Sequence, residues 1–192
     1  GHLSTHLETE FKILIEKNTY QKMLLAFQSV HGAPIVQTNE YFQDRQGILK
    51  AHYYSLRIRH LDGTYELTLK KPQGFAKLEF NQMLDADTYQ KFKQKVSFPS
   101  PVLDELAKEG VHIQDLEAIT TLTTTRYTFP YANGTLFLDA NRYGKHQDYE
   151  VEFEVDNEAE GRLIFQDLMH TYGYSYQQNC PGKMTRALQD LD

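Results

Sequence analysis

Two pairs of carboxylates stand at alternate positions in stretches that read as β-strands. Glu8 and Glu10 form the first pair, and Glu150 and Glu152 form the second. Because alternate residues of a strand point to the same face, each pair presents its oxygens on one side of a sheet. One such face taken alone is typical of a solvated surface. Its recurrence in a second strand indicates a set of hard oxygen ligands suited to Mg²⁺ or Mn²⁺.

Lysines and arginines recur in the same strands and suit an anionic ligand. Arginine offers a bidentate fork and lysine a point charge, so both together can bind several phosphate groups. The candidate phosphate-binding residues are Lys12, Arg57, Arg59, Lys70, Arg126 and Lys183. Acids for a metal and bases for phosphate are the composition that metal-assisted phosphoryl chemistry requires. No glycine-rich phosphate loop precedes a helix, which excludes the P-loop solution.

The elements that must position these residues are mainly strands joined by hairpins. Alternation of apolar and polar residues predicts eight strands, at about 7–16, 35–45, 51–60, 65–70, 76–83, 116–128, 135–142 and 148–155. Asp62-Gly63 and Asn133-Gly134 are two-residue hairpin signals. Two helices at about 85–115 form an insertion between two groups of strands. Further helices are expected after Asn18, after Asn157 and from Lys183.

Eight antiparallel strands are expected to close into a barrel, and two arrangements of its faces are open. The apolar sides of the strands can fill the barrel while the charges face water. Alternatively, the apolar sides face outward under amphipathic helices while the charges line the lumen. The chain has at least three amphipathic helices that need an apolar partner surface, which favours the second arrangement. The expected fold class is therefore α+β, a closed eight-stranded antiparallel β-barrel with a charged lumen and flanking helices.

Composition limits the partners and the compartment. The 192 residues carry a net charge of −6, which argues against a general nucleic-acid-binding surface. The single cysteine, Cys180, excludes an internal disulfide and suits a reducing compartment, so a cytoplasmic location is expected. No apolar run approaches the roughly 20 residues that span a bilayer. The opening residues 1–5 lack an initiator methionine and are set aside as a processed or engineered start.

In order along the chain, these residues resemble the signature of the CYTH superfamily, the triphosphate tunnel metalloenzymes. Glu8-Thr9-Glu10-Phe11-Lys12 is similar to the E-x-E-x-K motif of that family. The later matches are Leu56-Arg57-Ile58-Arg59, Leu67-Thr68-Leu69-Lys70, Arg126, Asp139, Glu150-Val151-Glu152-Phe153 and Lys183. The resemblance covers about residues 7–188, as a single tunnel domain. It implies a closed eight-stranded tunnel and a divalent-metal-dependent enzyme acting on inorganic triphosphate, thiamine triphosphate, nucleoside triphosphates or RNA 5′-triphosphate ends.

The resemblance also implies roles for single residues. Glu8, Glu10, Glu150 and Glu152 would hold one or two metal ions, with Asp139 and Glu79 as further candidate ligands. Lys12 and the other cations named above would grip the triphosphate, with Lys77 as an additional candidate. Glu154 extends the second acidic pair, so a Glu152/Glu154 register competes with Glu150/Glu152. Glu66 is expected at a solvated rim, and no histidine is required as a base. Arg186 is expected at the surface, with contact to the tunnel mouth as the alternative.

Three functions remain open at this point. The leading reading is a metal-dependent triphosphatase that releases phosphate. A class IV-type adenylyl cyclase, which makes cyclic AMP from ATP, would use the same phosphate and metal residues. A non-catalytic polyphosphate- or nucleotide-binding module is the third reading, although four glutamates in the site argue against binding anions alone. The sequence leaves the physiological triphosphate, the preferred metal and the oligomeric state undetermined.

Overall fold

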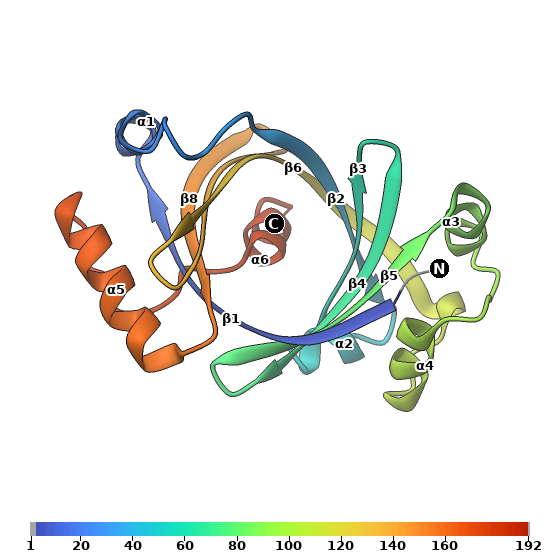
Figure 1. The fold of residues 1–192 in the computed structure, drawn as a ribbon. Coiled ribbons are helices and arrows are strands. Elements are labelled where there is room, and N and C mark those ends of the chain that lie inside the picture. The colour runs from blue at the N-terminus through green and yellow to red at the C-terminus, as the bar shows by residue number, and fades with distance from the viewer. Residues whose placement is uncertain (1–2, 192) are drawn as a thin grey trace. The chain divides into compact units, whose positions relative to one another are not determined.

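The computed structural model describes residues 3–191 and shows eight strands and six α-helices in that range (Figure 1). The strands are β1 Leu3–Ile15, β2 Ile35–Asp44, β3 Ser55–Leu61, β4 Thr64–Gln73, β5 Ala76–Leu84, β6 Leu116–Tyr131, β7 Gly134–Tyr143 and β8 His146–Val155. The helices are α1 Lys17–Ala26, α2 Ile48–Ala51, α3 Ala86–Lys93, α4 Pro101–Lys108, α5 Glu158–Thr171 and α6 Lys183–Gln189, and η1 Ile113–Asp115 is a 3₁₀ turn.

The strands hydrogen-bond in the cyclic order β1-β5-β4-β3-β2-β6-β7-β8, which closes the antiparallel sheet into a barrel. The predicted fold class is thereby confirmed. The chain divides into two compact units, which are described separately below. The first unit comprises the residues up to Leu7 together with Gln37–Thr121, and the second comprises Glu8–Val36 and the residues from Leu122 onward.

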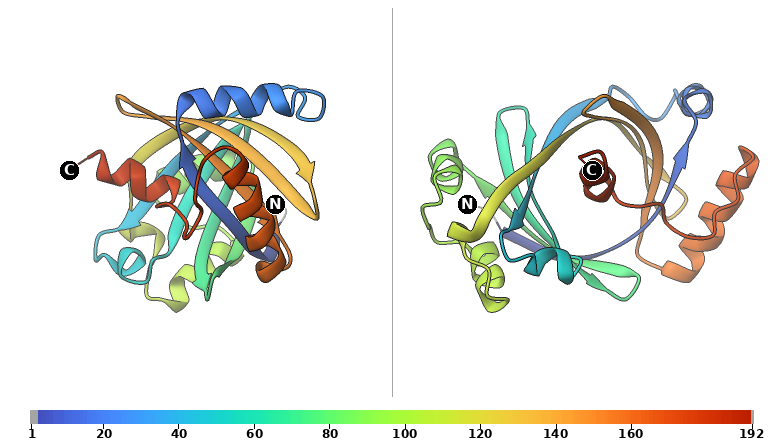
Figure 2. Two further views of the ribbon diagram at one scale, coloured as in Figure 1. Left: turned by 90° about the vertical axis from the view of Figure 1, so that its left-hand side faces the viewer. Right: turned by 180° about the vertical axis from the view of Figure 1, so that it is seen from behind.

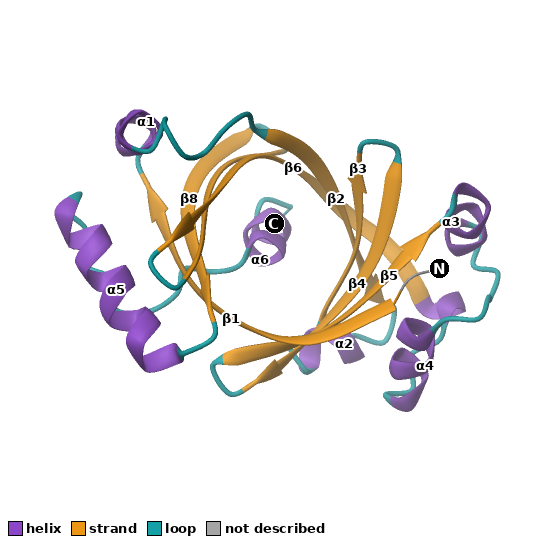
Figure 3. Ribbon diagram, in the orientation of Figure 1, coloured by secondary structure: helices purple, strands orange, loops and turns teal. Residues whose placement is uncertain are grey.

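In the first unit, β2 to β5 form an antiparallel meander whose apolar face is covered by helices. Arg57 lies opposite Thr68 on β4, so its neighbours Leu56 and Ile58 point to the other face. Leu56, Ile58, Leu67 and Leu69 are fully buried in one core. The helical residues of that core include Phe92, Val102 and Leu106, from α3 and α4, which lie along one side of β4 and β5 (Figure 3). Arg57 and Arg59, at alternate positions of β3, therefore lie on the face opposite this core.

Each of the two insertion helices begins at a side-chain cap. Ser100 caps α4, because its Oγ accepts a hydrogen bond from the Leu103 backbone N–H at 3.0 Å, and Pro101 follows at the first helical position. Asp85 caps α3 in the same way, accepting from the Thr88 N–H at 2.7 Å. These caps fix where the two helices start relative to the end of β5, and so aim their apolar residues at the meander.

In the second unit, β1, β8, β7 and β6 form a curved antiparallel sheet with helices on both faces (Figure 1). On its convex face, Phe165 of α5 stacks on Phe11 of β1 and Phe153 of β8, with ring centroids 6.0 and 6.2 Å apart. Tyr20 of α1 packs on Tyr149 of β8 at 4.9 Å. On the concave face lies α6, which the right-hand view of Figure 2 places inside the curve of the strands. The concave face carries the charged residues.

Several boundaries differ from the sequence prediction. Strand β3 begins at Ser55 instead of Ala51, because Ile48–Ala51 forms α2. Strand β1 begins at Leu3 instead of Leu7, so Leu3 to Thr5 belong to the sheet, while Gly1 and His2 lie outside the described residues. Helix α1 begins after Glu16 with no side-chain cap, and it ends at Ala26. The second hairpin turns through Ala132 and Asn133, because Tyr131 pairs with Gly134. Gly134 is needed within β7 instead, since a Cβ there would collide with the Glu154 carbonyl oxygen.

Among the described residues, none of the helices is both long and apolar enough to cross a bilayer.

Candidate functional site

The sequence-predicted site residues divide between the two units. In the first unit, Arg57 is buried at 9% exposure, and its Nε has no hydrogen-bond partner among residues 3–191. Arg59 donates from Nε to the Asn39 side-chain oxygen at 3.0 Å. Lys70 forms an ion pair with Glu79, with 3.4 Å between Nζ and Oε2. This face therefore carries three cations together with the buried carboxylate of Glu79.

Glu66 and Lys77 lie at the margin of the same face. Glu66 pairs with Arg59 across β3 and β4, and Lys77 pairs with Pro72 across β4 and β5. Both are half-buried. Glu79, the metal-ligand candidate of this unit, also lies 3.7 Å from His6 Nε2.

In the second unit, strand register brings the central residues into one row. Arg126 of β6 lies opposite Asp139 of β7, and Asp139 lies opposite Glu150 of β8. Arg126 grips Asp139 with a two-bond fork, Nε to Oδ1 at 2.9 Å and Nη2 to Oδ2 at 2.8 Å. Its Nη2 also lies 3.7 Å from Glu152 Oε2. The cross-strand pairing thus places one cation beside two buried carboxylates.

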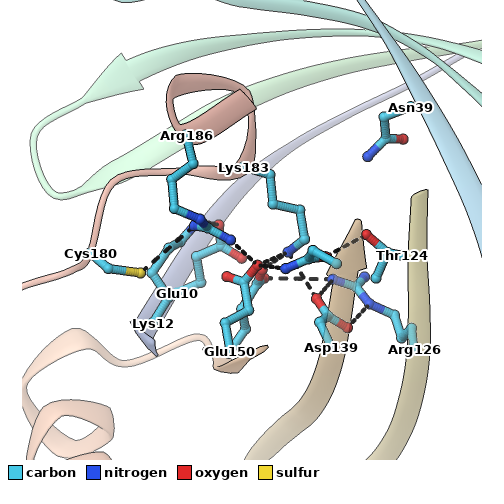
Figure 4. Close-up of polar contacts among 12 residues, drawn as sticks. Glu10, Lys12, Asn39, Thr124, Arg126, Asp139, Glu150, Cys180, Lys183 and Arg186 are labelled. Atoms are coloured by element: carbon cyan, nitrogen blue, oxygen red, sulfur yellow. Dashed lines mark hydrogen bonds and ion pairs between the residues drawn. The ribbon is translucent and has the colours of Figure 1, made fainter. Parts of the chain in front are cut away.

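Lys183, the first residue of α6, adds a cation to this row from the concave side (Figure 4). Its Nζ lies 2.8 Å from an oxygen of Asp139, 2.8 Å from Glu150 Oε1, and in contact with Glu152. Three carboxylates from two strands therefore share one ammonium.

The E-x-E-x-K strand contributes from the other side of β8. Lys12 pairs across the strands with Glu152, and Glu10 pairs with Glu154. Lys12 Nζ lies 2.9 Å from Glu10 Oε1. The side chain of Asn179 fixes this stretch of backbone, because it accepts from the Lys12 N–H at 2.8 Å and donates to the Glu10 carbonyl at 3.1 Å. The segment before α6 thereby forms hydrogen bonds to the β1 backbone, as a neighbouring strand would.

The carboxylates of the second unit fall into two groups of three. Asp139, Glu150 and Glu152 can bring one oxygen each within 4.8 Å of one another, and all are buried. Glu8, Glu10 and Glu154 form the other group. The sequence expected both acidic pairs in one set and left open whether Glu150 or Glu154 partners Glu152. All three β8 glutamates share one face, but Glu154 lies with the β1 pair, because it stands opposite Glu10 in the register.

The Asp139/Glu150/Glu152 group has the donors that a divalent cation needs. Carboxylate oxygens are the ligands that Mg²⁺ and Mn²⁺ prefer. Glu150 is fully buried, and its Oε2 has no hydrogen-bond partner among the described residues. Leaving a buried acceptor unpaired costs about 1–3 kcal/mol, so a positively charged partner at this oxygen would be stabilising. The residues present therefore fit a Mg²⁺ or Mn²⁺ ion.

Burial and charge shift the pKa values of this group in opposite directions. Burial raises the pKa of Glu150, and the neighbouring Glu152 and Asp139 raise it further against the cations Lys183 and Arg186. Burial also disfavours the charged form of Glu152, but Lys183, Lys12 and Arg126 outweigh it and hold that pKa well below its usual range. The neighbouring cations thus stabilise the charged form of Glu152. At Glu150 they do not offset burial and the neighbouring carboxylates.

Arg186 was expected at the surface, and the structure contradicts this. It is 6% exposed and forms a fork with Asp148, Nε to Oδ2 at 2.9 Å and Nη2 to Oδ1 at 3.2 Å. The cause is the position of α6, which sits on the charged concave face of the sheet (Figure 4). Because residues three apart share a helix face, Arg186 points the same way as Lys183.

Sequence reasoning also missed Asp148 and Asn141. Asn141 donates to Asp148 Oδ1 at 2.9 Å and to Glu150 Oε1 at 2.7 Å. Its own side-chain oxygen accepts from the Thr124 hydroxyl at 2.6 Å. The available signal was alternation, since Asp148 precedes Glu150 by two residues and Asn141 follows Asp139 by two.

Cys180 borders the cluster without joining it. Its Sγ lies 3.9 Å from Arg186 Nη1. Burial raises the pKa of the thiol to about 11, and the charge of Glu150 adds to the effect. At neutral pH the sulfur is therefore a protonated thiol and a poor nucleophile.

Comparison with known proteins places the chain in a family. The family model of the CYTH domain matches residues 6–179. A protein of Bacillus subtilis (strain 168) named "Putative triphosphatase YjbK" is 31% identical over 190 residues, covering 98% of this chain and 97% of that protein.

Solved structures agree on the fold. A crystal structure of a protein from Bacillus halodurans, named a "putative adenylate cyclase", superposes with a TM-score of 0.86 at 32% identity, covering 95% of this chain and 97% of that one. HpAC1 from Hippeastrum, a protein described with a dominant triphosphatase activity, gives a TM-score of 0.80 at 19% identity, covering 96% and 95%. The resemblance predicted from the sequence is confirmed, and the chain belongs to the CYTH domain family.

Proposed function

We propose that the protein is a divalent-metal-dependent hydrolase of a triphosphate, either inorganic triphosphate or an organic one such as thiamine triphosphate or a nucleoside triphosphate. The observation that carries the proposal is the buried Asp139/Glu150/Glu152 group set among Lys12, Arg126 and Lys183. Buried carboxylates beside buried cations are the pairing needed to hold both a metal ion and a polyanion. The triphosphatase name of the relative at 31% identity supports the substrate class.

Asp139, Glu150 and Glu152 would hold Mg²⁺ or Mn²⁺, with Glu8 and Glu10 as the second carboxylate pair and Glu79 as a further candidate. Such an ion supplies neutralisation of negative charge on the phosphate oxygens. Lys12, Arg126 and Lys183 would donate to those oxygens from the second unit. The proposal assigns the same task in the first unit to Arg57, Arg59 and Lys70, with Lys77 as an additional candidate.

Three features support the assignment of the cations. Arg57 keeps a buried donor, Nε, without a protein partner among the described residues. The charges of Glu10, Glu152 and Glu150 outweigh the effect of burial on Lys12 and hold its pKa well above the usual range, so it stays charged at any physiological pH. Asp139, Glu150 and Glu152 likewise hold the pKa of Lys183 above its usual value. We propose residues 7–188 as one functional domain, because the family model, which matches residues 6–179, includes residues of both units.

A class IV-type adenylyl cyclase is the second candidate, supported by the cyclase name of the Bacillus halodurans protein at 32% identity. Hydrolysis and cyclisation would use the same phosphate and metal residues, and they differ in whether water or the ribose 3′-hydroxyl attacks.

The single cysteine suits a reducing compartment, and we place the activity in the cytoplasm on that ground.

Product analysis tests the proposal. The purified protein is incubated with inorganic triphosphate, ATP or thiamine triphosphate, each with Mg²⁺, with Mn²⁺ and with EDTA, and all products are resolved. The proposal predicts phosphate release that EDTA abolishes. Cyclic AMP and pyrophosphate from ATP would contradict the hydrolase and identify a cyclase. Tight triphosphate binding without turnover of any of the three substrates would contradict the hydrolase and identify a binding module.

A further inference from the structure

All of the N–H groups of Arg186 contact atoms of the protein itself. Its Nε and Nη2 bind Asp148, and Nη2 also donates to Glu150 Oε1 at 2.7 Å. Its Nη1 donates to the Pro181 carbonyl at 2.5 Å and faces Cys180 Sγ at 3.9 Å. A guanidinium has five N–H groups, and these five contacts account for them. Arg186 therefore has no donor left for a phosphate, which separates it from Lys183 one turn earlier.

The two oxygens of Glu150 are held very differently. Oε1 accepts from Arg186 at 2.7 Å and from Asn141 at 2.7 Å, and it lies 2.8 Å from Lys183 Nζ. Oε2 is buried and has no hydrogen-bond partner among residues 3–191. A carboxylate anchored by three donors on one oxygen cannot turn freely, so the direction of the other oxygen is fixed as well. Glu150 thus presents a single, unpaired oxygen to the acidic group it shares with Asp139 and Glu152.

The anchor of this arrangement lies one step further out. Asp148 receives the fork of Arg186 and also accepts from Asn141 at 2.9 Å and from the Tyr143 hydroxyl at 2.8 Å. These bonds tie the guanidinium to β7 and β8 before it reaches Glu150. The planar fork suits this geometry, because it can bond two carboxylates on alternate strand positions at once. A lysine at position 186 would supply a charge but only a point contact.

We propose that Arg186 is a positioning residue for a divalent cation: with Asn141 it holds Oε1 of Glu150 and so presents Oε2 to an ion bound by Asp139, Glu150 and Glu152. This inference rests on the metal site of the proposed function. Arg186 acts through Glu150 and touches neither the ion nor the phosphate. Residues that orient metal ligands in this way typically change metal affinity about 10- to 100-fold when they are lost.

Direct Mn²⁺ binding tests the proposal without any substrate. Free Mn²⁺ is measured by its electron paramagnetic resonance signal during titration of the wild type, Arg186→Met, Arg186→Lys and the matched control Arg142→Met, whose side chain is exposed on β7. Arg186→Met is expected to raise the Kd for Mn²⁺ about 10- to 100-fold. Arg186→Lys should give an intermediate Kd, and the control should bind like the wild type.

A double-mutant cycle with Glu150→Gln separates positioning from general damage to the fold. If Arg186 acts through Glu150, then adding Arg186→Met to Glu150→Gln changes the Kd no further. An equal loss of affinity in both backgrounds, or wild-type affinity in Arg186→Met, would overturn the proposal, as would a wild type that binds no Mn²⁺. Should Arg186→Met lose its circular dichroism spectrum, Arg186→Lys is judged by the same two criteria.

The outcome is independent of the proposed activity. The expected cycle in a protein that hydrolyses no triphosphate would keep the role of Arg186 and remove the triphosphatase. A metal-dependent triphosphatase whose Mn²⁺ affinity is unchanged in Arg186→Met would keep the proposed activity and remove the role of Arg186.

Discussion

Lys183 and Asp139 meet at the centre of the charged cluster, with 2.8 Å between the Nζ of the lysine and a carboxylate oxygen. Asn179 binds the β1 backbone just before the start of α6, and Arg186 binds β8 one turn later. The C-terminal segment is therefore anchored to the sheet both before and after Lys183. This contact links the C-terminal helix to the sheet and makes the cluster sensitive to changes in α6.

Replacing Lys183 with methionine should destabilise the metal-free protein and make its stability depend on Mg²⁺. Removing one partner from a buried charge cluster costs about 3–5 kcal/mol. For a chain of this size that lowers the melting temperature by roughly 10 °C. Added Mg²⁺ should restore most of the loss, since the ion supplies the missing positive charge.

Calorimetry in EDTA and in Mg²⁺ measures this effect. Lys145→Met, in the exposed turn between β7 and β8, is the control and should melt like the wild type in both buffers. A deficit of the same size with and without Mg²⁺ would show that the carboxylates do not bind the ion.

Arg57→Ala should raise KM and lower kcat for the triphosphate. The buried Nε of Arg57 is a donor without a partner among the described residues, and its charge matters most as phosphate charge develops. We expect kcat to fall about 100-fold, as for the loss of one transition-state donor. Steady-state kinetics beside Arg45→Ala, an exposed arginine of the same unit, checks it. Unchanged kcat with raised KM would limit Arg57 to ground-state binding.

Asn179→Ala should loosen the β1 strand. The amide makes two hydrogen bonds to the backbone of Glu10 and Lys12 and accepts a third from the Tyr176 hydroxyl. Leaving half-buried groups unpaired costs about 1–3 kcal/mol. Urea unfolding measures the loss, with the exposed neighbour Gln178→Ala as the control. Equal stability of the two variants would mean that Asn179 does not fasten the tail.

Glu40 should make the first unit sensitive to acid. Burial alone would raise the pKa of this carboxyl, but hydrogen bonds from Lys93 and His60, the charge of Lys93 and a hydrogen bond from Tyr89 outweigh it and lower the pKa. A lowered folded pKa stabilises the protein fully above the unfolded value of about 4.3, and this stabilisation is lost as the pH falls through the folded pKa. Glu40→Gln should therefore be less stable than the wild type at pH 7.

Urea unfolding from pH 7 to pH 3 tests the sign of this effect. The gap in free energy of unfolding between the wild type and Glu40→Gln should stay constant down to about pH 4.5 and shrink below it. Glu117→Gln, at an exposed position of β6, is the control for the substitution itself. A gap that widened in acid would contradict the assigned direction.

Strand periodicity predicted the faces of the sheet, because a half-buried strand must alternate. Leu56 and Ile58 are fully buried in the helix-covered core, while Arg57 between them lies on the other face with an unpaired donor. The barrel and the insertion helices also followed from local signals. The second hairpin was shifted by one residue, since a close approach to Glu154, and not the turn, requires Gly134.

The register between β1 and β8 and the placement of α6 could not be predicted, because neither leaves a local pattern. The register that sets Glu10 opposite Glu154 and Lys12 opposite Glu152 decides which carboxylates group together. Arg186 has the sequence surroundings of an ordinary surface arginine, and only the docking of α6 on the concave face buries it. Alternation places Asn141 and Asp148 on the charged face, but the hydrogen bond between them and the bonds from Arg186 to Asp148 follow from the register and from the position of α6.

The most direct measurement is phosphate release from inorganic triphosphate as a function of Mg²⁺ concentration, for the wild type, Glu150→Gln and the exposed control Glu117→Gln. We predict saturable, EDTA-sensitive release by the wild type and the control, and none by Glu150→Gln with an intact fold by circular dichroism. Release by Glu150→Gln at the wild-type rate, or release by the wild type that persists in EDTA, would contradict the claim that buried carboxylates hold a metal ion for triphosphate hydrolysis.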